Sequence, residues 1–233
     1  MLFPTIEFGI FFLIVFAVSW AMRGAPELRK FILLGASYFF YGWWDWRFLG
    51  LLFLSTLINY LAGLAVAHVR SEGLRKFIVG IAVVAGLSIL GFFKYYGFFL
   101  TSFATLLETA GLERDLPFMQ VILPVGISFF TFQGISYVVD VYRGHATAEK
   151  SLLNVMLYIS FFPQLVAGPI VRAADFLPQL HRAPALTRAH IGVGVVLILS
   201  GLAKKMVIAT YLAPELVDPV FFGPPALGPP VLM

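Results

Sequence analysis

The sequence predicts an all-α protein, a polytopic integral membrane helix bundle with a broken or re-entrant helix around Pro163 to Arg172. Of its 233 residues, 60% are hydrophobic and 12% are charged, and the mean hydropathy is +0.92. A soluble domain has about 25% charged residues, so the excess apolar surface must face lipid. The apolar residues also form long runs, and a helix needs about 20 of them to cross the hydrocarbon core of a bilayer.

The first apolar run, residues 4–22, predicts a membrane helix rather than a cleavable signal peptide. No basic residue precedes this run, Glu7 lies near its start, and the first arginine, Arg23, follows it. Further runs at residues 31–44, 48–67, 77–93 and 98–107 predict the next helices. The runs at 31–44 and 98–107 are short, and for both the sequence leaves three alternatives: a tilted, an interfacial or a half-inserted helix.

The aromatic stretch YFFYGWWDW, residues 38–46, predicts a membrane–water boundary between the second and third runs. Tyrosine and tryptophan rings settle at the level of the lipid headgroups because one part of the ring is apolar and the other polar. A ligand-stacking site is the alternative interpretation.

The run at residues 117–142 carries polar residues at helical spacing. Within LPVGISFFTFQGISYVVDVYRG, residues 123–144, the side chains of Gln133, Tyr137 (or Ser136) and Asp140 fall on one helical face. Polar groups at membrane depth are costly and face a protein interior or a cavity. This face is therefore the candidate lining of a polar cavity, although an i,i+3 ion pair between Asp140 and Arg143 at the helix end is an equal alternative.

The distribution of basic residues predicts that the N-terminus lies outside. With this orientation eight basic residues fall in inside loops and three in outside loops, as the positive-inside rule requires. The inside set is Arg23, Arg29, Lys30, Arg70, Arg75, Lys76, Arg143 and Lys150, and the outside set is Arg47, Lys94 and Arg114.

The stretch FFPQLVAGPIVR, residues 161–172, interrupts the next apolar run, residues 152–171. Pro163 removes a backbone donor, and the pair Gly168-Pro169 is a strong helix breaker. If the run crossed the membrane, Arg172 and the basic residues after it would lie outside, against the pattern above. We therefore expect a re-entrant or broken helix that lines a polar cavity, followed by an interfacial segment at residues 172–190. A kinked spanning helix with a snorkelling arginine is the alternative.

The last apolar run, residues 191–217, is interrupted by Lys204 and Lys205, which either end a helix at the cytoplasmic surface or place a charge in the cavity. Residues 218–233 hold five prolines and two glycines and predict a loop. Because the chain ends there without a capping element, we expect a truncated polypeptide, with the transmembrane domain at residues 1–217 and the loop at 218–233.

Several functional classes are excluded or disfavoured by residues that are missing. The chain has no cysteine, and its four histidines, His68, His145, His181 and His190, have no H-E-x-x-H neighbourhood, so no metal site is expected. Neither a nucleophile elbow nor a phosphate loop occurs. Nucleic-acid binding is not expected either, since the net charge of +4 is small and basic residues in membrane proteins mark cytoplasmic loops.

Two motifs carry a family resemblance. The stretch at residues 123–144, together with NVMLYISFFPQLVAGPIVRAADFLPQL at 154–180, resembles the N-terminal half of the membrane-bound O-acyltransferases, in the bacterial alginate O-acetylase branch. The early stretch LLGASYFFYGWWDWRFLGLLFLSTLINYLAG, residues 33–63, also resembles that branch. The resemblance therefore extends over nearly the whole chain.

The resemblance implies a multi-pass enzyme of the bacterial inner membrane that transfers an acetyl group to a hydroxyl of an exported polysaccharide, such as alginate or a cell-wall glycan. No bound cofactor is implied. The acyl donor, acetyl-CoA or a carrier-linked acyl group, is a substrate used on the cytoplasmic side. The implied partners are membrane lipid, the missing C-terminal half and other polysaccharide acetylation proteins.

The resemblance carries over no catalytic residue, because the family's histidine motifs, R-R-W-H-I-S-L-S and G-L-W-H-G, do not occur. Acyl transfer to a hydroxyl needs a general base, usually histidine, so the 233 residues alone are expected to be inactive. The positions that match family patterns are expected to shape the cavity: Pro163, Gln164, Gly168, Pro169 and Arg172 in the first pattern, and Asp140, Tyr142 and Arg143 in the second.

Two other functions stay open on the sequence. Broken helices with polar residues at mid-membrane also build the binding sites of transporters and channels, although no internal symmetry is visible here. The third possibility is a non-catalytic scaffold of a polysaccharide assembly complex.

Overall fold

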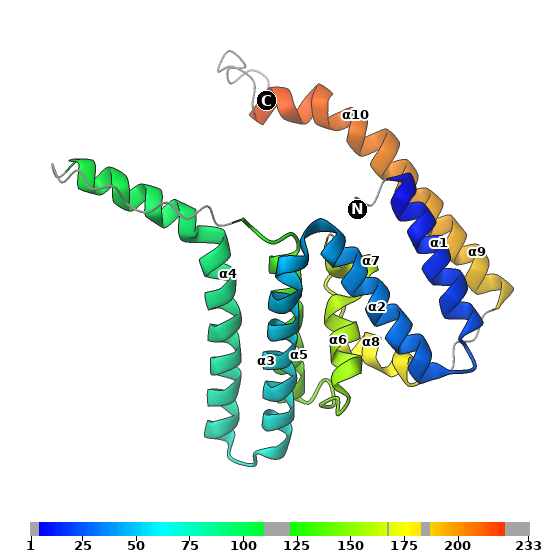
Figure 1. Cartoon of the computed structure of the whole chain (residues 1–233), viewed down its shortest axis with the longest axis horizontal. Helices are drawn as coiled ribbons and strands as arrows, with labels where there is room; N and C mark the ends of the chain where they lie inside the picture. Colours follow the sequence, from blue (N-terminus) through cyan, green and yellow to red (C-terminus); the bar gives the residue numbers. More distant parts are fainter. Residues whose placement is uncertain (1–4, 110–121, 167, 183–186, 222–233) are drawn as a thin grey trace. The chain divides into compact units, whose positions relative to one another are not determined.

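The computed structural model describes residues 5–109, 122–166, 168–182 and 187–221, and it divides the chain into two compact units. One unit comprises residues 14–183, and the other comprises residues 1–13 and 184–233. The described residues form helices joined by turns, with no strand among them, so the predicted all-α class is confirmed (Figure 1). Helix α1 (Ile6–Ala21) is the first element of the chain.

Three described helical segments are long and apolar enough to cross a membrane. They are Pro26–His68, Glu72–Leu107 and Arg188–Phe221. The protein is therefore a polytopic membrane protein. In the larger unit the elements are α2 (Pro26–Asp45), η1 (Trp46–Phe48), α3 (Leu49–His68), α4 (Glu72–Thr109), α5 (Ile127–Arg143), α6 (Leu152–Ser160), α7 (Phe162–Leu165) and α8 (Ala173–Leu180).

Helices α2 and α3 are joined by the short 3₁₀ turn η1, which begins at Trp46, the last residue of the predicted aromatic boundary. The carboxylate of Asp45 accepts hydrogen bonds from the backbone N–H and the guanidinium of Arg47, which caps this turn. The rings of Trp43 and Trp46 are exposed, whereas Tyr41 is buried. One side of the aromatic stretch thus packs inward, and its other side presents rings outward, as in a boundary belt.

Helix α4 joins two apolar runs that the sequence separates, residues 77–93 and 98–107. It is 38 residues long, which corresponds to about 57 Å at about 1.5 Å per residue and exceeds the roughly 30 Å of a hydrocarbon core. Figure 1 shows that α4 changes direction along its length. That residues 98–107 are tilted, interfacial or half-inserted stays a prediction.

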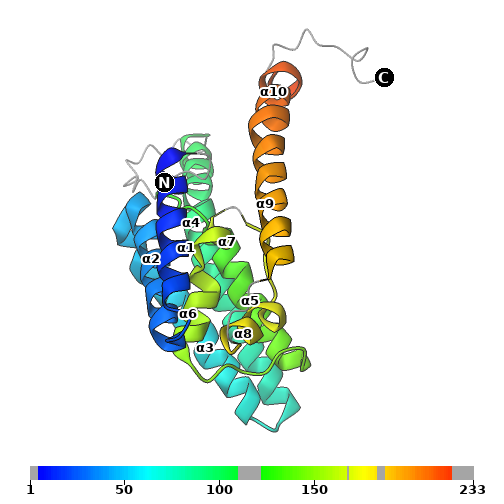
Figure 2. The ribbon, with the colours of Figure 1, turned by 90° about the vertical axis from the view of Figure 1, so that its right-hand side faces the viewer.

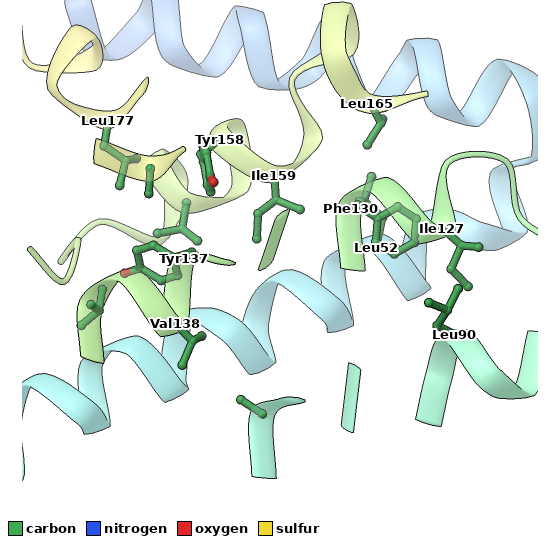
Figure 3. Close-up of a cluster of buried hydrophobic side chains, with 14 of the residues drawn as sticks. Leu52, Leu90, Ile127, Phe130, Tyr137, Val138, Tyr158, Ile159, Leu165 and Leu177 are labelled. Carbon is green, nitrogen blue, oxygen red and sulfur yellow. The ribbon is translucent and has the colours of Figure 1, made fainter. Parts of the chain in front are cut away.

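The core of the larger unit is centred on α3 and α5, which pack closely against each other. Two glycines permit the approach: a Cβ atom at Gly63 would lie 2.7 Å from Cε1 of Tyr137, and one at Gly134 would collide with the side chain of Asn59. Figure 3 shows Tyr137 of α5 and Tyr158 of α6 among the buried side chains of this core. The polar face predicted on residues 133–140 is therefore directed into the protein interior.

In the smaller unit, one continuous helical run extends from Arg188 to Phe221 (Figure 2). Its elements are α9 (Arg188–Ala203), η2 (Lys204–Ala209), α10 (Thr210–Leu212), η3 (Ala213–Val217) and α11 (Asp218–Phe221). The side chain of Thr187 caps its start by accepting the N–H of His190 at 3.2 Å.

Two expectations about this run need correction. Lys204 and Lys205 do not end the helix, because the chain continues through the π-helical turn η2. The loop expected from residue 218 begins later, since α11 extends to Phe221, and residues 222–233 lie outside the described part. The second π-helical turn, η3, contains Pro214, and a widened turn accommodates a residue that lacks a backbone donor.

Candidate functional site

The predicted break in the helix at residues 152–171 lies at Phe161. Helix α6 ends at Ser160, and Phe161, with φ −57° and ψ 112°, leaves the helical conformation before the single turn of α7. In a continuous helix the N–H of Phe162 would bond to the carbonyl of Tyr158. It donates instead to the hydroxyl of Ser37 in α2, at 3.2 Å. The break therefore leaves the carbonyl of Tyr158 without its helical partner.

Two glutamines supply the missing donors. Nε2 of Gln133 in α5 lies 2.6 Å from the carbonyl oxygen of Tyr158, and Nε2 of Gln164 in α7 lies 2.9 Å from it. Both glutamine side chains are buried. A carbonyl without a partner at this depth would be costly, so these two side chains stabilise the broken backbone.

After the break the chain returns to the end of the unit from which α6 started. Helix α6 has nine residues, or about 14 Å at about 1.5 Å per residue, which is too short to span. Beyond α7, the phenol of Tyr158 donates to the carbonyl of Val171 at 2.8 Å. Nε2 of His181, after the segment, then lies 2.7 Å from Oε2 of Glu149, before it. The predicted broken helix is confirmed, and the chain turns back after the break instead of continuing as a kinked helix.

The glycine of the Gly-Pro pair is required at the turn itself. The N–H of Gly168 donates to the carbonyl of Gln164 at 3.1 Å, and a Cβ atom at residue 168 would collide with the Cα atom of Gln164. Pro163 lies in the first turn of α7, where a missing N–H is tolerated. Of the other residues in this pattern, Pro169 and Arg172 are exposed.

The predicted polar face of α5 is buried. Gln133, Tyr137 and Asp140 are each less than 9% exposed, whereas Ser136 is half-buried. The phenol oxygen of Tyr137 accepts the backbone N–H of Glu149 at 3.0 Å, which fixes the loop after α5. The structure thus brings Gln133, Tyr137 and Gln164 together around the re-entrant segment. That they also line a cavity stays a prediction.

The predicted ion pair between Asp140 and Arg143 is absent. Oδ1 of Asp140 lies instead 3.8 Å from Nδ1 of His145, and its Oδ2 is buried without a hydrogen bond in the described structure. The chain reverses at Gly144, whose positive φ of 75° ends α5 and brings His145 back over Asp140. Arg143 is exposed.

Tyr142 belongs to a separate polar group at the same end of the unit. Its hydroxyl donates to Oε1 of Glu72 at 2.5 Å, and its carbonyl accepts from the guanidinium of Arg75 at 2.8 Å. Arg75 also lies over the Tyr142 ring, 5.1 Å from the ring centroid. These contacts tie the start of α4 to the end of α5.

The sequence does not predict three residues that form hydrogen bonds around the re-entrant segment: Ser37, Tyr158 and Glu149. Ser37 lies 125 residues from its partner Phe162, and the carbonyl of Tyr158 has no side-chain signature. No pattern in the sequence links them to the break. Among the residues that the structure describes, no group of three or more histidine, aspartate and glutamate side chains is arranged to hold a metal ion.

The described elements define the class: an α-helical polytopic membrane protein with a re-entrant segment sealed by buried glutamines. The chain is 37% identical over 219 residues to the probable alginate O-acetylase AlgI of Azotobacter vinelandii, covering 92% of this chain and 42% of that protein. It is 36% identical over 218 residues to the probable alginate O-acetylase AlgI of Pseudomonas aeruginosa, covering 91% and 41%. It is 33% identical over 210 residues to the peptidoglycan O-acetyltransferase of Helicobacter pylori, covering 79% and 39%.

The chain is thus related to the bacterial alginate O-acetylases and to a peptidoglycan O-acetyltransferase, and the predicted resemblance to membrane-bound O-acyltransferases is confirmed. It spans about two fifths of the length of these curated relatives. No protein-family profile matches the chain. No solved structure matches it either.

Proposed function

We propose that the chain is the N-terminal part of a membrane O-acetyltransferase that modifies hydroxyls of an exported polysaccharide, such as alginate or a cell-wall glycan. The observation that supports this most directly is the similarity to proteins named as O-acetylases over about nine tenths of the chain. The relatives do not favour the transporter, channel or scaffold alternatives.

In this proposal the described residues build the wall of the reaction cavity. Gln133, Gln164 and Ser37 hold the re-entrant backbone in place through hydrogen bonds. Tyr137, Asp140 and the family-pattern residues around them shape the polar face. The general base and the donors to the developing oxyanion come from the C-terminal part, where the family's histidine motifs lie.

The acyl donor, acetyl-CoA or a carrier-linked acyl group, reaches the cavity from the cytoplasmic side, and the glycan is modified on the other side with the help of further acetylation proteins. The chain lies in the bacterial inner membrane with its N-terminus outside. The supporting feature is the set of basic residues at one end of the larger unit, in the turn between α3 and α4 and in the loop between α5 and α6.

The DNA immediately downstream of the Met233 codon tests the proposal first. An open frame that continues into a G-L-W-H-G-like motif supports a two-part enzyme, whose acetyl transfer to the polysaccharide is then measured with and without the C-terminal part. We expect transfer only when both parts are present. Acetyl transfer by the purified 233 residues alone would contradict the assignment of the base to the C-terminal part.

A further inference from the structure

A cavity of about 450 Å³ lies at the end of the larger unit where the re-entrant segment begins and ends. Its lining comes from the loop between α5 and α6 and from α8 with the two residues after it. The floor is apolar, with alanines and Leu177 of α8, whereas the polar lining consists of His145, Thr147, Glu149, His181 and Arg182.

Each histidine of this cavity has a carboxylate at one ring nitrogen. Glu149 lies 2.7 Å from Nε2 of His181, and Asp140 lies 3.8 Å from Nδ1 of His145. The two carboxylates are nearly covered, with side-chain exposures of 10% and 11%, whereas the histidine side chains are 56% and 57% exposed. The rings are thus more exposed than the carboxylates behind them. A neutral imidazole has one N–H donor and one acceptor nitrogen, so His181, whose Nε2–H faces the carboxylate of Glu149, donates a second N–H to a ligand only as the imidazolium.

The carboxylate of Glu149 is already fully engaged within the protein. Its Oε1 accepts the N–H of Ser151 at 3.0 Å, and its Oε2 is paired with His181. Burial alone raises the pKa of this carboxyl, but the hydrogen bonds from Ser151 and His181 outweigh burial, and the pKa is lowered from its ordinary value. Glu149 is thus an anion that orients His181 rather than an open acceptor in the cavity.

The guanidinium of Arg182 is the remaining charge on the lining, and it forms no ion pair with any described residue. The surroundings are also rich in cations, since Arg70, Arg143 and Lys150 lie at the same end. An unpaired arginine presents several N–H donors to one space, and each histidine adds an N–H there in its imidazolium form, which is the chemistry that recognises phosphate.

The position of the cavity identifies the source of the phosphate. It lies just after the end of α5, and the end of α5 contacts the start of α4 through Tyr142, so the cavity is at the level where the membrane-crossing part of the unit meets water. Helix α8 beside it buries Ala173 and Leu177 and exposes its opposite side, as an interfacial helix does. Phospholipid headgroups occupy this level of a bilayer.

We propose that this cavity is a phospholipid site, in which the headgroup phosphate binds Arg182, His181 and His145 and the lipid joins α8 to the loop between α5 and α6. The site is independent of the proposed acetyl transfer. Its ligand is bound through phosphate chemistry, which a free phosphate also offers, so the test must separate the two sources.

The test uses the purified 233-residue chain in maltoside micelles with added phosphatidylglycerol, and native mass spectrometry counts the lipid that it retains. Arg182→Gln should weaken retention about tenfold, because a charge-assisted hydrogen bond is lost. The double variant His145→Gln/His181→Gln should weaken it by at least as much. Arg70→Gln is the matched control, since it removes a charge at the same end outside the cavity, and it should retain the lipid as the unaltered chain does.

Equal retention by the unaltered chain and by Arg182→Gln overturns the site, and so does an equal loss in Arg70→Gln, which would reflect general attraction to a basic surface. Diacylglycerol, which lacks the phosphate, should not be retained, and its retention at the level of phosphatidylglycerol overturns phosphate recognition. Displacement of the lipid by millimolar inorganic phosphate overturns the lipid as the occupant. Arg182 is exposed, and an unchanged circular dichroism melt checks that its variant folds.

Discussion

At the scale of single residues, the re-entrant segment depends on backbone contacts that admit little change. Gly168 is the clearest case, because any side chain there meets the backbone of the preceding turn at Gln164. The two glutamines that bond to Tyr158 are the second case, because they replace a helical hydrogen bond with side-chain donors.

Gly168→Ala should destabilise the chain by about 1–3 kcal/mol, as overpacking against rigid backbone does. The measurement is the free energy of unfolding of the purified chain in mixed micelles. Gly80→Ala serves as the control, because a Cβ atom there meets nothing within 4 Å and alanine favours a helix. It should leave stability unchanged or raise it slightly. A loss in Gly168→Ala no greater than in the control would contradict the steric argument.

Gln133→Met and Gln164→Met should each cost about 1 kcal/mol, because each removes one of two donors to the carbonyl of Tyr158. The double variant leaves that carbonyl buried without a partner, so its cost should exceed the sum of the single costs by about 1 kcal/mol or more. A double-mutant cycle of unfolding free energies measures this coupling. Strictly additive costs would show that the two glutamines do not share one acceptor.

Glu149 makes the stability of the chain sensitive to acid. Its pKa is lowered in the folded protein, because hydrogen bonds from Ser151 and His181 outweigh its burial. A carboxyl group whose pKa is lowered by folding stabilises the folded protein at pH values above its unfolded-state pKa. This stabilisation is lost as the pH falls through the folded-state pKa. The difference in Tm between the unaltered chain and Glu149→Gln should therefore be largest near pH 7 and shrink below about pH 4.5. A difference that grows on acidification would contradict this assignment.

At the scale of elements, the sequence predicts the residues that interrupt the helix locally. It does not predict the distant residues that form hydrogen bonds with the interrupted segment. Pro163 and the Gly168-Pro169 pair act on their own backbone, so the break could be placed near them. Ser37 and Gln133 come from helices far away in the sequence and act by tertiary contact, which no local pattern reports. For the same reason the sequence offers Arg143, three residues on, as one alternative partner of Asp140, whereas the contact of Asp140 with His145 depends on the turn at Gly144.

Ser37→Ala should loosen the contact between α2 and α7, because it leaves the N–H of Phe162 buried without an acceptor. We expect a loss of about 1–2 kcal/mol and faster amide hydrogen exchange at Phe162, Gln164 and Leu165. Ser160→Ala is the matched control. Both serines are fully buried and donate to a carbonyl of their own helix, but only Ser37 also accepts from another element. Equal effects of the two changes would assign no special role to Ser37.

The terminal helical run shows a different limit of sequence reasoning. Lys204, Lys205 and Pro214 are the signals that usually end an apolar helix, yet the run continues to Phe221. Two π-helical turns, at Lys204–Ala209 and Ala213–Val217, coincide with these residues. A widened turn changes the hydrogen-bond partner of each residue without ending the helix, and composition alone does not distinguish the two outcomes.

At the scale of the whole molecule, the re-entrant path decides on which side of the membrane the later residues lie. The turn between α3 and α4 and the loop before α6 are at one end of the larger unit, and α8 returns to that end through His181 and Glu149. The turn between α2 and α3 is at the other end of the unit, because the whole length of α3 separates it from the turn between α3 and α4.

Single cysteines at Arg70 and Arg182 should therefore be labelled from the same side of the membrane, and a cysteine at Arg47 from the opposite side. The chain has no cysteine of its own, so each variant carries one reporter without background. We expect the pair at residues 70 and 182 to react with a membrane-impermeant maleimide only after the cells are opened. Labelling of residue 182 together with residue 47 would contradict the re-entrant path.

The sealed break also has a consequence for how the chain is made. Ser37 and Gln133 precede the break in the sequence, and a chain emerges from the ribosome N-terminus first. The helices that accept the re-entrant segment are therefore already synthesised when residues 158–162 appear. The re-entrant segment can therefore pack against these helices as soon as it is synthesised, and its unpaired backbone groups need not remain in lipid without hydrogen-bond partners.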